Sequence, residues 1–246
     1  MPVSPKASII IPCYNAADWV EQCVSSAINQ DYDNYEVIAI DNESSDSTMK
    51  KLLDLQNQYP DILTVASEKN IYPNCWDEAR LKGFEMATGD YFFTLASDDF
   101  YDHNYVSNCM KYINAAKDRI LALQSPIKNV QADGTSVGYQ AHQYNSIDEF
   151  KNLLLTKCPV NSPTVVYNRK IFDNDDFTTK PETYGGAADY DLYCQLADKD
   201  IFIWPAHKYT GYNYRWHPQQ ATWNVHREGV NYDQMIQNFW KKKWQM

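Results

Sequence analysis

The stretch Tyr35–Tyr59, with the sequence YEVIAIDNESSDSTMKKLLDLQNQY, determines the fold class of this chain. Its first part, Tyr35–Asp41, is a short apolar run that predicts a buried strand, and in Ser47–Tyr59 the apolar residues recur at helical spacing. Ser45 or Asp46 can cap this helix. A strand followed directly by an amphipathic helix is typical of a parallel sheet, because parallel neighbours need a crossover connection.

The same alternation of strand and helix continues on both sides of this stretch. Apolar runs predict three more strands, and helical spacing predicts two more helices. The strands cover Ala7–Pro12, Leu63–Ser67 and Tyr91–Ala96, and the helices cover Asp18–Gln30 and Asn74–Ala87. We therefore predict an α/β fold whose Rossmann-like, mostly parallel central sheet carries helices on both faces. In such sheets ligands bind beyond the carboxyl ends of the strands, where the polar clusters Pro12–Asn15, Asp41–Asp46 and Ser97–Asp99 fall.

The remainder of the chain is less regular. We expect helices at His103–Ala116, Ile147–Thr156, Asp189–Ala197 and Tyr232–Trp244, strands at Ile120–Gln124, Thr164–Tyr167, Ile201–Trp204 and Tyr209–Trp216, and a hairpin turn at Asp133–Gly134. No internal repeat, linker or low-complexity stretch interrupts it. One domain with a second, smaller lobe is therefore expected.

The charge balance limits the possible partners. The chain has 22 Lys and Arg against 32 Asp and Glu, a net charge of −10, and its only basic run is Lys241–Lys243. These numbers argue against nucleic acid as a partner. An anionic substrate would need positive charge supplied locally. The sequence has no apolar run long enough to span a bilayer and no signal-peptide pattern, and its six scattered cysteines favour free thiols in a reducing cytoplasm.

Two strand ends carry acidic residues that can do chemistry. Asp98 and Asp99 follow a hydrophobic strand and can bind a hard cation such as Mg²⁺ or Mn²⁺, although they can instead cap the helix that begins near His103. Asp41 ends its strand and can accept a hydrogen bond from a base N–H or a ribose hydroxyl, or cap the next helix. Pro12 cannot continue a central ladder, and Tyr14, two residues later, can stack on a nucleobase.

Four stretches, IIPCYN (10–15), AIDNESSDST (39–48), NIYPNCW (70–76) and ATGDYFFTLASDD (87–99), together resemble glycosyltransferase family 2. These are inverting enzymes of the GT-A fold that use nucleotide-diphosphate sugars. The resemblance implies a role for each matching residue. Pro12, Tyr14 and Asn15 would frame the nucleotide, Asp41 would contact the base, usually uracil, Asn70 and Asn74 would line the nucleotide-sugar pocket, and Asp98 and Asp99 would lie in the motif that binds Mn²⁺ or Mg²⁺.

The chain departs from the family pattern at three positions of these motifs. Asn42 replaces a frequent second Asp, Glu43 replaces the usual glycine, and Ala96 stands where the metal motif often begins with Asp. These departures leave open a non-catalytic nucleotide-sugar binder, beside a nucleotidyltransferase and a pure interaction module.

Two later stretches also resemble the family. GGAADYDL (185–192) is similar to its Glu-Asp signature, with Ala188 in the Glu position, so the resemblance implies Asp189 as the general base and Asp191 as the alternative. Both can instead stabilise the amino end of their helix. YRWHPQQAT (214–222) is similar to its Tyr-Arg-x-His segment, which implies His217 as a metal ligand or diphosphate donor and Arg215 as positive charge for the donor; a solvated surface strand is the alternative.

The resemblance implies one GT-A domain over 1–246, with a nucleotide-sugar half (1–124), an acceptor half (125–230) and a C-terminal helix (231–246). It would transfer a sugar from a UDP-sugar to a hydroxyl of a glycan or lipid-linked acceptor. The acceptor would meet roughly Ser125–Glu182, and the aromatics that could stack on sugars or belong to the core are Tyr139, Tyr144, Tyr184 and Trp204. Phe239–Trp244 mixes aromatic and basic residues, as helices at the inner membrane face do, although a solvated helix end has the same composition.

Overall fold

The computed structural model describes residues 4–72, 77–116, 119–173, 177–220 and 229–245. Its main sheet has seven strands in the order β10-β6-β9-β4-β1-β2-β3. The strands are β1 (Ala7–Cys13), β2 (Tyr35–Asp41), β3 (Leu63–Ser67), β4 (Tyr91–Thr94), β6 (Ala122–Gln124), β9 (Val166–Asn168) and β10 (Ile203–Pro205). Only β9 runs antiparallel to its neighbours β4 and β6. The predicted mostly parallel α/β sheet is confirmed.

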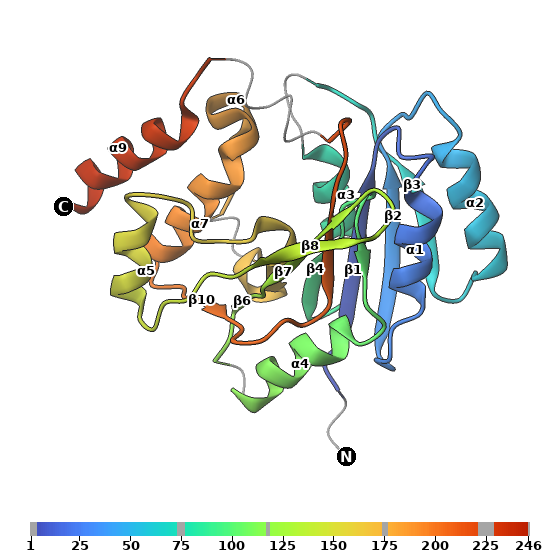
Figure 1. Cartoon of the computed structure of the whole chain (residues 1–246), viewed down its shortest axis with the longest axis horizontal. Helices are drawn as coiled ribbons and strands as arrows, with labels where there is room; N and C mark the ends of the chain where they lie inside the picture. The colour runs from blue at the N-terminus through green and yellow to red at the C-terminus, as the bar shows by residue number, and fades with distance from the viewer. Residues whose placement is uncertain (1–3, 73–76, 117–118, 174–176, 221–228, 246) are drawn as a thin grey trace.

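Alternate residues of β1 face opposite sides of this sheet. Ile9 and Ile11 pack beneath α1 (Val20–Ile28), α2 (Thr48–Gln58) and α4 (Tyr105–Ala115), whereas Ile10 packs against α3 (Glu78–Met86) on the other face. Figure 1 shows α1 and α2 beside each other on one side of the sheet. The alternation explains why a nearly continuous apolar run forms a central strand: both of its faces are covered.

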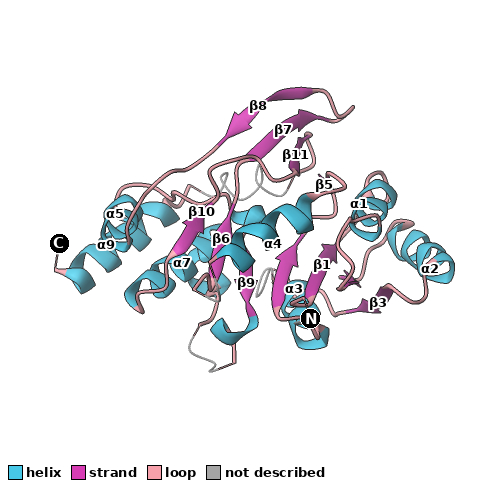
Figure 2. Ribbon diagram, turned by 90° about the horizontal axis from the view of Figure 1, so that it is seen from below, coloured by secondary structure: helices cyan, strands magenta, loops and turns pink. Residues whose placement is uncertain are grey.

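A smaller sheet lies beyond the carboxyl ends of β1 and β4 (Figure 2). Its order is β5-β11-β7-β8, formed by β5 (Phe100–Tyr101), β7 (Ile127–Gln131), β8 (Ser136–Gln140) and β11 (Tyr212–Trp216). The turn between β7 and β8 contains Gly134 at φ 87°, which agrees with the hairpin predicted there. The two-residue strand β5 was not predicted, because it is too short to show a periodicity.

Three helices pack around a second apolar cluster, which also includes residues of β6, β9 and β10. α5 (Ile147–Leu154), α7 (Ala188–Asp198) and α9 (Tyr232–Trp244) meet there, and α9 inserts Ile236 and Trp240. The short α6 (Pro181–Tyr184) was not predicted. Three 3₁₀ turns complete the described structure: η1 (Ser162–Thr164), η2 (Arg169–Ile171) and η3 (Gly185–Ala187). No helix of the described residues is long and apolar enough to cross a membrane.

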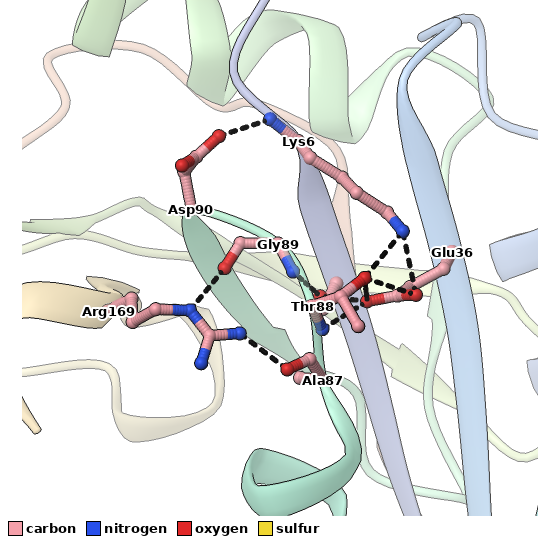
Figure 3. Close-up of polar contacts among 8 residues, drawn as sticks. Lys6, Glu36, Ala87, Thr88, Gly89, Asp90 and Arg169 are labelled. Carbon is pink, nitrogen blue, oxygen red and sulfur yellow. Dashed lines mark hydrogen bonds and ion pairs between the residues drawn. The ribbon is translucent and has the colours of Figure 1, made fainter. Parts of the chain in front are cut away.

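The ATGD segment, 87–90, ties the amino ends of three strands together (Figure 3). Glu36 accepts hydrogen bonds from Lys6 Nζ (2.8 Å), Ser8 Oγ (2.6 Å) and the backbone N–H of Thr88 (2.6 Å). Burial raises the pKa of Glu36, but these bonds outweigh it and hold the pKa below its usual value. A Cβ on Gly89 would lie 2.5 Å from Ser8 Oγ, so this position accepts only glycine without rearrangement. The motif therefore fixes the register of β1, β2 and β4 at the edge opposite the site.

Candidate functional site

The loops after β1 and β2 are bonded to each other. Parallel pairing places Cys13 opposite Asp41, at the carboxyl ends of the two strands. Beyond that point Asn15 accepts a hydrogen bond from the backbone N–H of Ser45 (2.8 Å) and donates its own N–H to Ser44 Oγ (2.9 Å). Asn15 has φ 46°, a left-handed conformation that asparagine tolerates better than most residues. Two predicted polar clusters thus form one wall.

Asp41 leaves one carboxylate oxygen unused. Its side chain is 3% exposed, and Oδ2 accepts a hydrogen bond from the N–H of Ser44 (3.1 Å). No donor among the described residues reaches Oδ1, although that atom is buried. A buried acceptor without a partner is costly, so an N–H or O–H from a ligand would be stabilised here. Asp46, and not Asp41, bonds the N–H of Thr48 at the start of α2, which removes the helix-cap alternative for Asp41.

Pro12 and Tyr14 lie at this wall in different ways. β1 extends to Cys13, so the prediction that Pro12 ends the strand is wrong. Pro12 is tolerated because β4 pairs with β1 only as far as Ile10, and the missing N–H faces the side that β4 has already left. Tyr14 is 54% exposed, and its ring is free to contact a ligand.

Glu43 occupies the position at which the family motif usually has glycine. The residue has φ 55°, the conformation for which glycine is favoured. Its carboxylate accepts a hydrogen bond from the backbone N–H of Asn70 (3.1 Å), which links the loop after β2 to the loop after β3. The Asn70 side chain accepts the N–H of Tyr72 (3.0 Å). Asn74, the other predicted residue of this segment, lies outside the described residues.

The adjacent carboxylates of Asp98 and Asp99 have different surroundings. Asp98 is 25% exposed at its side chain, and its Oδ2 lies 2.9 Å from His217 Nε2. Asp99 is 1% exposed and accepts hydrogen bonds from the N–H of Arg215 (2.7 Å) and the hydroxyl of Tyr212 (2.8 Å). Burial raises the pKa of Asp99, and the negative charge of Asp98 adds to this rise. Asp98 therefore borders the site, whereas Asp99 holds β11 in place.

Asp98 and His217 fit a divalent cation as a pair of ligands. The carboxylate oxygen suits both Mn²⁺ and Mg²⁺, whereas the imidazole nitrogen is a ligand for transition metals such as Mn²⁺ and not one that Mg²⁺ prefers. Their separation of 2.9 Å is close to the roughly 3.0 Å between neighbouring ligands of an octahedral ion with bonds of about 2.1 Å. The described residues contain no group of three or more such side chains. Asp99, the other predicted ligand, uses one oxygen for the N–H of Arg215 and the other for the hydroxyl of Tyr212.

Arg215, which was predicted to supply positive charge to the donor, has its guanidinium bonded within the protein. Its guanidinium donates to the carbonyl oxygens of Asp98 (2.7 Å) and Ala132 (2.6 Å) and to Gln22 Oε1 (2.6 Å). The residue is 2% exposed, and the guanidinium carbon lies 4.5 Å from the centre of the Trp19 ring. Burial lowers the pKa of Arg215. Because its N–H groups already donate to three oxygens and the Trp19 ring lies against it, the guanidinium stabilises the loop that carries Asp98.

Asp189, the residue that the resemblance implies as the general base, lies on the first turn of α7. Its Oδ2 accepts a hydrogen bond from Ser162 Oγ, and its Oδ1 accepts the backbone N–H of Tyr190 (2.8 Å). Burial raises its pKa, and the hydrogen bond from Ser162 opposes the rise. A carboxylate with a raised pKa is a better proton acceptor near neutral pH than an exposed one.

Asp191 joins two helices of the fold. Its side chain is fully buried and accepts hydrogen bonds from Trp240 Nε1 and Gln195 Nε2, both at 2.8 Å, and Lys180 Nζ lies 3.4 Å away. These contacts join α7 to α9. The structure therefore does not bring Asp191 together with Asp189 or Asp98 in one site.

A cavity of about 270 Å³ is lined by residues that are bonded to predicted site residues. Ser162, the partner of Asp189, lines it, and so does Gln220, which accepts the backbone N–H of His217 (3.3 Å). The remaining lining residues are Ile127, Asn129, Gln140, Val160, Asn161, Pro163, Tyr214 and Trp216. Amide side chains beside an exposed tryptophan are suited to hydroxyl-rich rings.

The predicted stacking aromatics divide by burial. Tyr144 and Tyr184 are 2% and 7% exposed, and both belong to the apolar cluster around α5, α7 and α9. Tyr139 and Trp204 are exposed, but neither lines the 270 Å³ cavity. The cavity aromatics Tyr214 and Trp216 were not singled out as stacking residues, although strand alternation places both on the face opposite Arg215.

An ion pair on α3 was missed by the sequence analysis. Arg80 donates from Nε to Asp77 Oδ1 (2.6 Å), and its NH2 group bonds the other carboxylate oxygen, which also accepts the hydroxyl of Thr179 (3.1 Å). The opposite charges three residues apart in DEAR, 77–80, were the available signal. Arg80 also lowers the pKa of Asp189 through its charge.

Comparisons with known proteins agree with this geometry. The family model described as Glycosyl transferase family 2 matches residues 8–177. Chondroitin synthase of Pasteurella multocida (strain Pm70) is 28% identical over 199 residues, 80% of this chain but 19% of that protein. The Escherichia coli protein WfgD, a UDP-Glc:alpha-D-GlcNAc-diphosphoundecaprenol beta-1,3-glucosyltransferase, is 30% identical over 69% of this chain and 63% of its own length. The chain thus spans about a fifth of the first of these relatives.

Solved structures share the fold. S. aureus TarS 1-349 in complex with UDP-GlcNAc superposes with a TM-score of 0.70 at 18% identity, covering 92% of this chain and 62% of that one. The mannosyltransferase PcManGT from Pyrobaculum calidifontis, solved with GDP-Man and Mn²⁺, gives a TM-score of 0.65 at 17% identity, with 92% and 61% covered. At these identities the likeness concerns the fold alone, and it is the GT-A arrangement.

Proposed function

This chain belongs to glycosyltransferase family 2, and on that premise we propose that it transfers a sugar from a UDP-sugar to an acceptor hydroxyl with inversion. One observation carries the proposal: the 270 Å³ cavity is lined by Gln220, which accepts the backbone N–H of His217 from the pair Asp98–His217, and by Ser162 of the pair Ser162–Asp189. An acceptor site next to a proton acceptor is what a single displacement requires. A non-catalytic binder would have no use for the second pair.

The donor nucleotide is proposed to lie against the wall formed by the loops after β1 and β2. The unpaired Oδ1 of Asp41 would accept the imide N–H of uracil, and the exposed ring of Tyr14 would cover the base. Asn70 would lie along the nucleotide-sugar pocket beside Asp41. The choice of UDP over other nucleotides rests on the family resemblance and on relatives whose names specify UDP-sugars.

The diphosphate is proposed to bind beside Asp98 and His217, which would hold Mn²⁺ or Mg²⁺. A bound cation of this kind neutralises the charge that develops on the leaving diphosphate. Arg215 contributes indirectly, because its bond to the Asp98 carbonyl fixes the loop that carries this ligand. Asp99 contributes in the same way, by anchoring the strand that precedes His217.

Asp189 is proposed to take the proton from the acceptor hydroxyl as that hydroxyl attacks the anomeric carbon. Its position beside the cavity suits this role, and burial gives it a pKa closer to neutrality than that of a solvated carboxylate. The acceptor sugar would occupy the 270 Å³ cavity, with Asn129, Asn161 and Trp216 as contacts.

The acceptor is proposed to be a glycan or a lipid-linked sugar at the inner membrane face. WfgD, whose name specifies a diphosphoundecaprenol acceptor, supports the second choice. On α9, Met235 and Phe239 are 44% and 50% exposed, one helical turn apart, and Lys242 continues the same stripe. Such a face suits peripheral contact with an anionic membrane surface.

The test is a panel of UDP-sugars with Mn²⁺, with and without sugar acceptors, in which release of UDP is measured. We expect turnover with at least one UDP-sugar, and we expect Asp189→Asn to abolish it while UDP affinity stays near that of the unmodified chain. Full turnover by Asp189→Asn would remove the base assignment. UDP-sugar binding without any turnover would favour a non-catalytic binder. The departures from the family motifs at Asn42, Ala96 and Ala188 would then be the reason.

A further inference from the structure

A chain of three side chains behind the cavity ends at Asp189. Tyr193, on the same helix, is 1% exposed and donates its hydroxyl to Ser162 Oγ (2.9 Å). Ser162 in turn donates to Asp189 Oδ2. Burial raises the pKa of Tyr193 well above its usual value, so this phenol keeps its proton and remains a donor.

The direction of these hydrogen bonds follows from chemistry. An ionised carboxylate only accepts, so the single proton of Ser162 points to Asp189, and the oxygen lone pairs of Ser162 remain for Tyr193. The phenol thereby fixes the rotation of the serine hydroxyl. A hydroxyl that is held in this way donates to the carboxylate in a single orientation.

The backbone that carries Ser162 is held firmly. Ser162 begins the 3₁₀ turn η1, whose second residue is Pro163. The preceding Asn161 is 3% exposed, donates its N–H to Gln124 Oε1 (3.0 Å) and bonds the carbonyl of Ser125 (2.9 Å) through its side chain. This support joins the serine to β6 and the start of the small sheet. Ser162 is thus fixed both to the wall of the cavity and to Asp189.

We propose that Ser162, supported by Tyr193, is a positioning residue that keeps the Asp189 carboxylate ionised and oriented toward the acceptor cavity. The proposal rests on the role of Asp189 as the base. Ser162 takes no part in the bonds that form or break in the reaction. Instead it presents a lone pair of Asp189 to the incoming hydroxyl, in the way that the partner of a base orients it in other enzymes.

Other groups around Asp189 act on its protonation as well. Burial raises its pKa and the charge of Asp77 adds to this, whereas Ser162, the N–H of Tyr190 and the charge of Arg80 lower it. Tyr167 and Cys158 also approach it, but burial raises the pKa of both, so they stay neutral. Because Ser162 stabilises the charged form, its loss raises the pKa of Asp189. For a hydrogen bond to a charged group we expect a rise of about one pH unit.

The experiment compares three variants by two readouts. In protein labelled with ¹³C at aspartate, the titration of the Asp189 carboxyl, assigned by its loss in Asp189→Asn, reports the pKa without any substrate. We expect Ser162→Ala to raise this pKa by about one unit and Tyr193→Phe to raise it by less. Ser162→Thr, which keeps a hydroxyl, restores it. Tyr32→Phe is the control, because it removes a phenol whose hydroxyl bonds the Pro5 carbonyl (2.6 Å), at the edge of the main sheet opposite the site.

The second readout is the pH profile of kcat/KM, with the UDP-sugar and acceptor that give turnover in the panel. The acidic limb of Ser162→Ala should move upward with the pKa of Asp189, and the rate on the plateau should fall on the order of tenfold through lost orientation. An unchanged titration and an unchanged profile in both Ser162→Ala and Tyr193→Phe would overturn the proposal, even if Asp189→Asn is inactive. An active Asp189→Asn would instead overturn the proposed function, whatever the titration shows.

Discussion

Replacing either Asp98 or Asp99 by asparagine should separate ligand binding from stability. Asp99 is buried and accepts two hydrogen bonds, from the Arg215 N–H and the Tyr212 hydroxyl. An amide in its place offers one oxygen, so one of these donors then faces an N–H₂ group. Losing one hydrogen bond to a charged acceptor costs about 2 kcal/mol, which in a chain of 246 residues lowers Tm by about 4–8 °C.

Asp98→Asn should leave stability within about 1 kcal/mol, because the side chain is partly exposed and bonds His217 through a single oxygen. The same substitution should remove the stabilisation that Mn²⁺ and UDP confer together, since ligand binding raises Tm only where a binding site is intact. Urea unfolding and thermal scans with and without Mn²⁺–UDP measure both effects. If Asp98→Asn lost as much stability as Asp99→Asn, or if Asp99→Asn lost only the response to Mn²⁺, the division of roles between these neighbours would be wrong.

Three further outcomes test other parts of the structure. Asp41→Asn should weaken UDP binding about tenfold in calorimetry, because the acceptor that is free in the protein becomes a donor, while unfolding is little changed. Gly89→Ala should lower the free energy of unfolding in urea by about 1–3 kcal/mol, since its Cβ would meet Ser8 Oγ at 2.5 Å; an unchanged midpoint would contradict the packing argument. The double substitution Met235→Asp and Phe239→Asp should abolish flotation with anionic phosphatidylglycerol vesicles, whereas equal flotation of the unmodified chain with neutral vesicles would count against a charge-assisted contact.

Sequence reasoning was most successful where local pattern and sheet geometry act together. The run YEVIAID forms β2 with the predicted bounds, and α9 covers Tyr232–Trp244 as expected. Parallel pairing then requires that Cys13 and Asp41 lie side by side, so the first two polar clusters form one wall. The strand ends that carry the site therefore follow from patterns that are visible in the chain.

Residues whose role depends on distant packing could not be assigned in the same way. Arg215 lies in a strand that the sequence predicts, but only the folded chain brings Trp19 and Gln22 around the guanidinium. Asp98 and Asp99 are indistinguishable in sequence, and their division is decided by Tyr212, which is 113 positions away from Asp99. No sequence pattern around Ser162 marks it, because its hydrogen bond to Asp189 forms only when the folded chain brings it to α7.

The placement of Arg215 changes how the negative charge of the donor must be met. The chain carries a net charge of −10, and this arginine was the natural candidate to offset a diphosphate. Its guanidinium is instead bonded to two carbonyl oxygens and Gln22, and moving it to a phosphate would break all three bonds. The carboxylate of Asp98 beside His217 adds further negative charge to the same place. A diphosphate next to Asp98 is therefore repelled unless a divalent cation lies between them, so we expect UDP to bind poorly in EDTA and its affinity to rise steeply with added Mn²⁺.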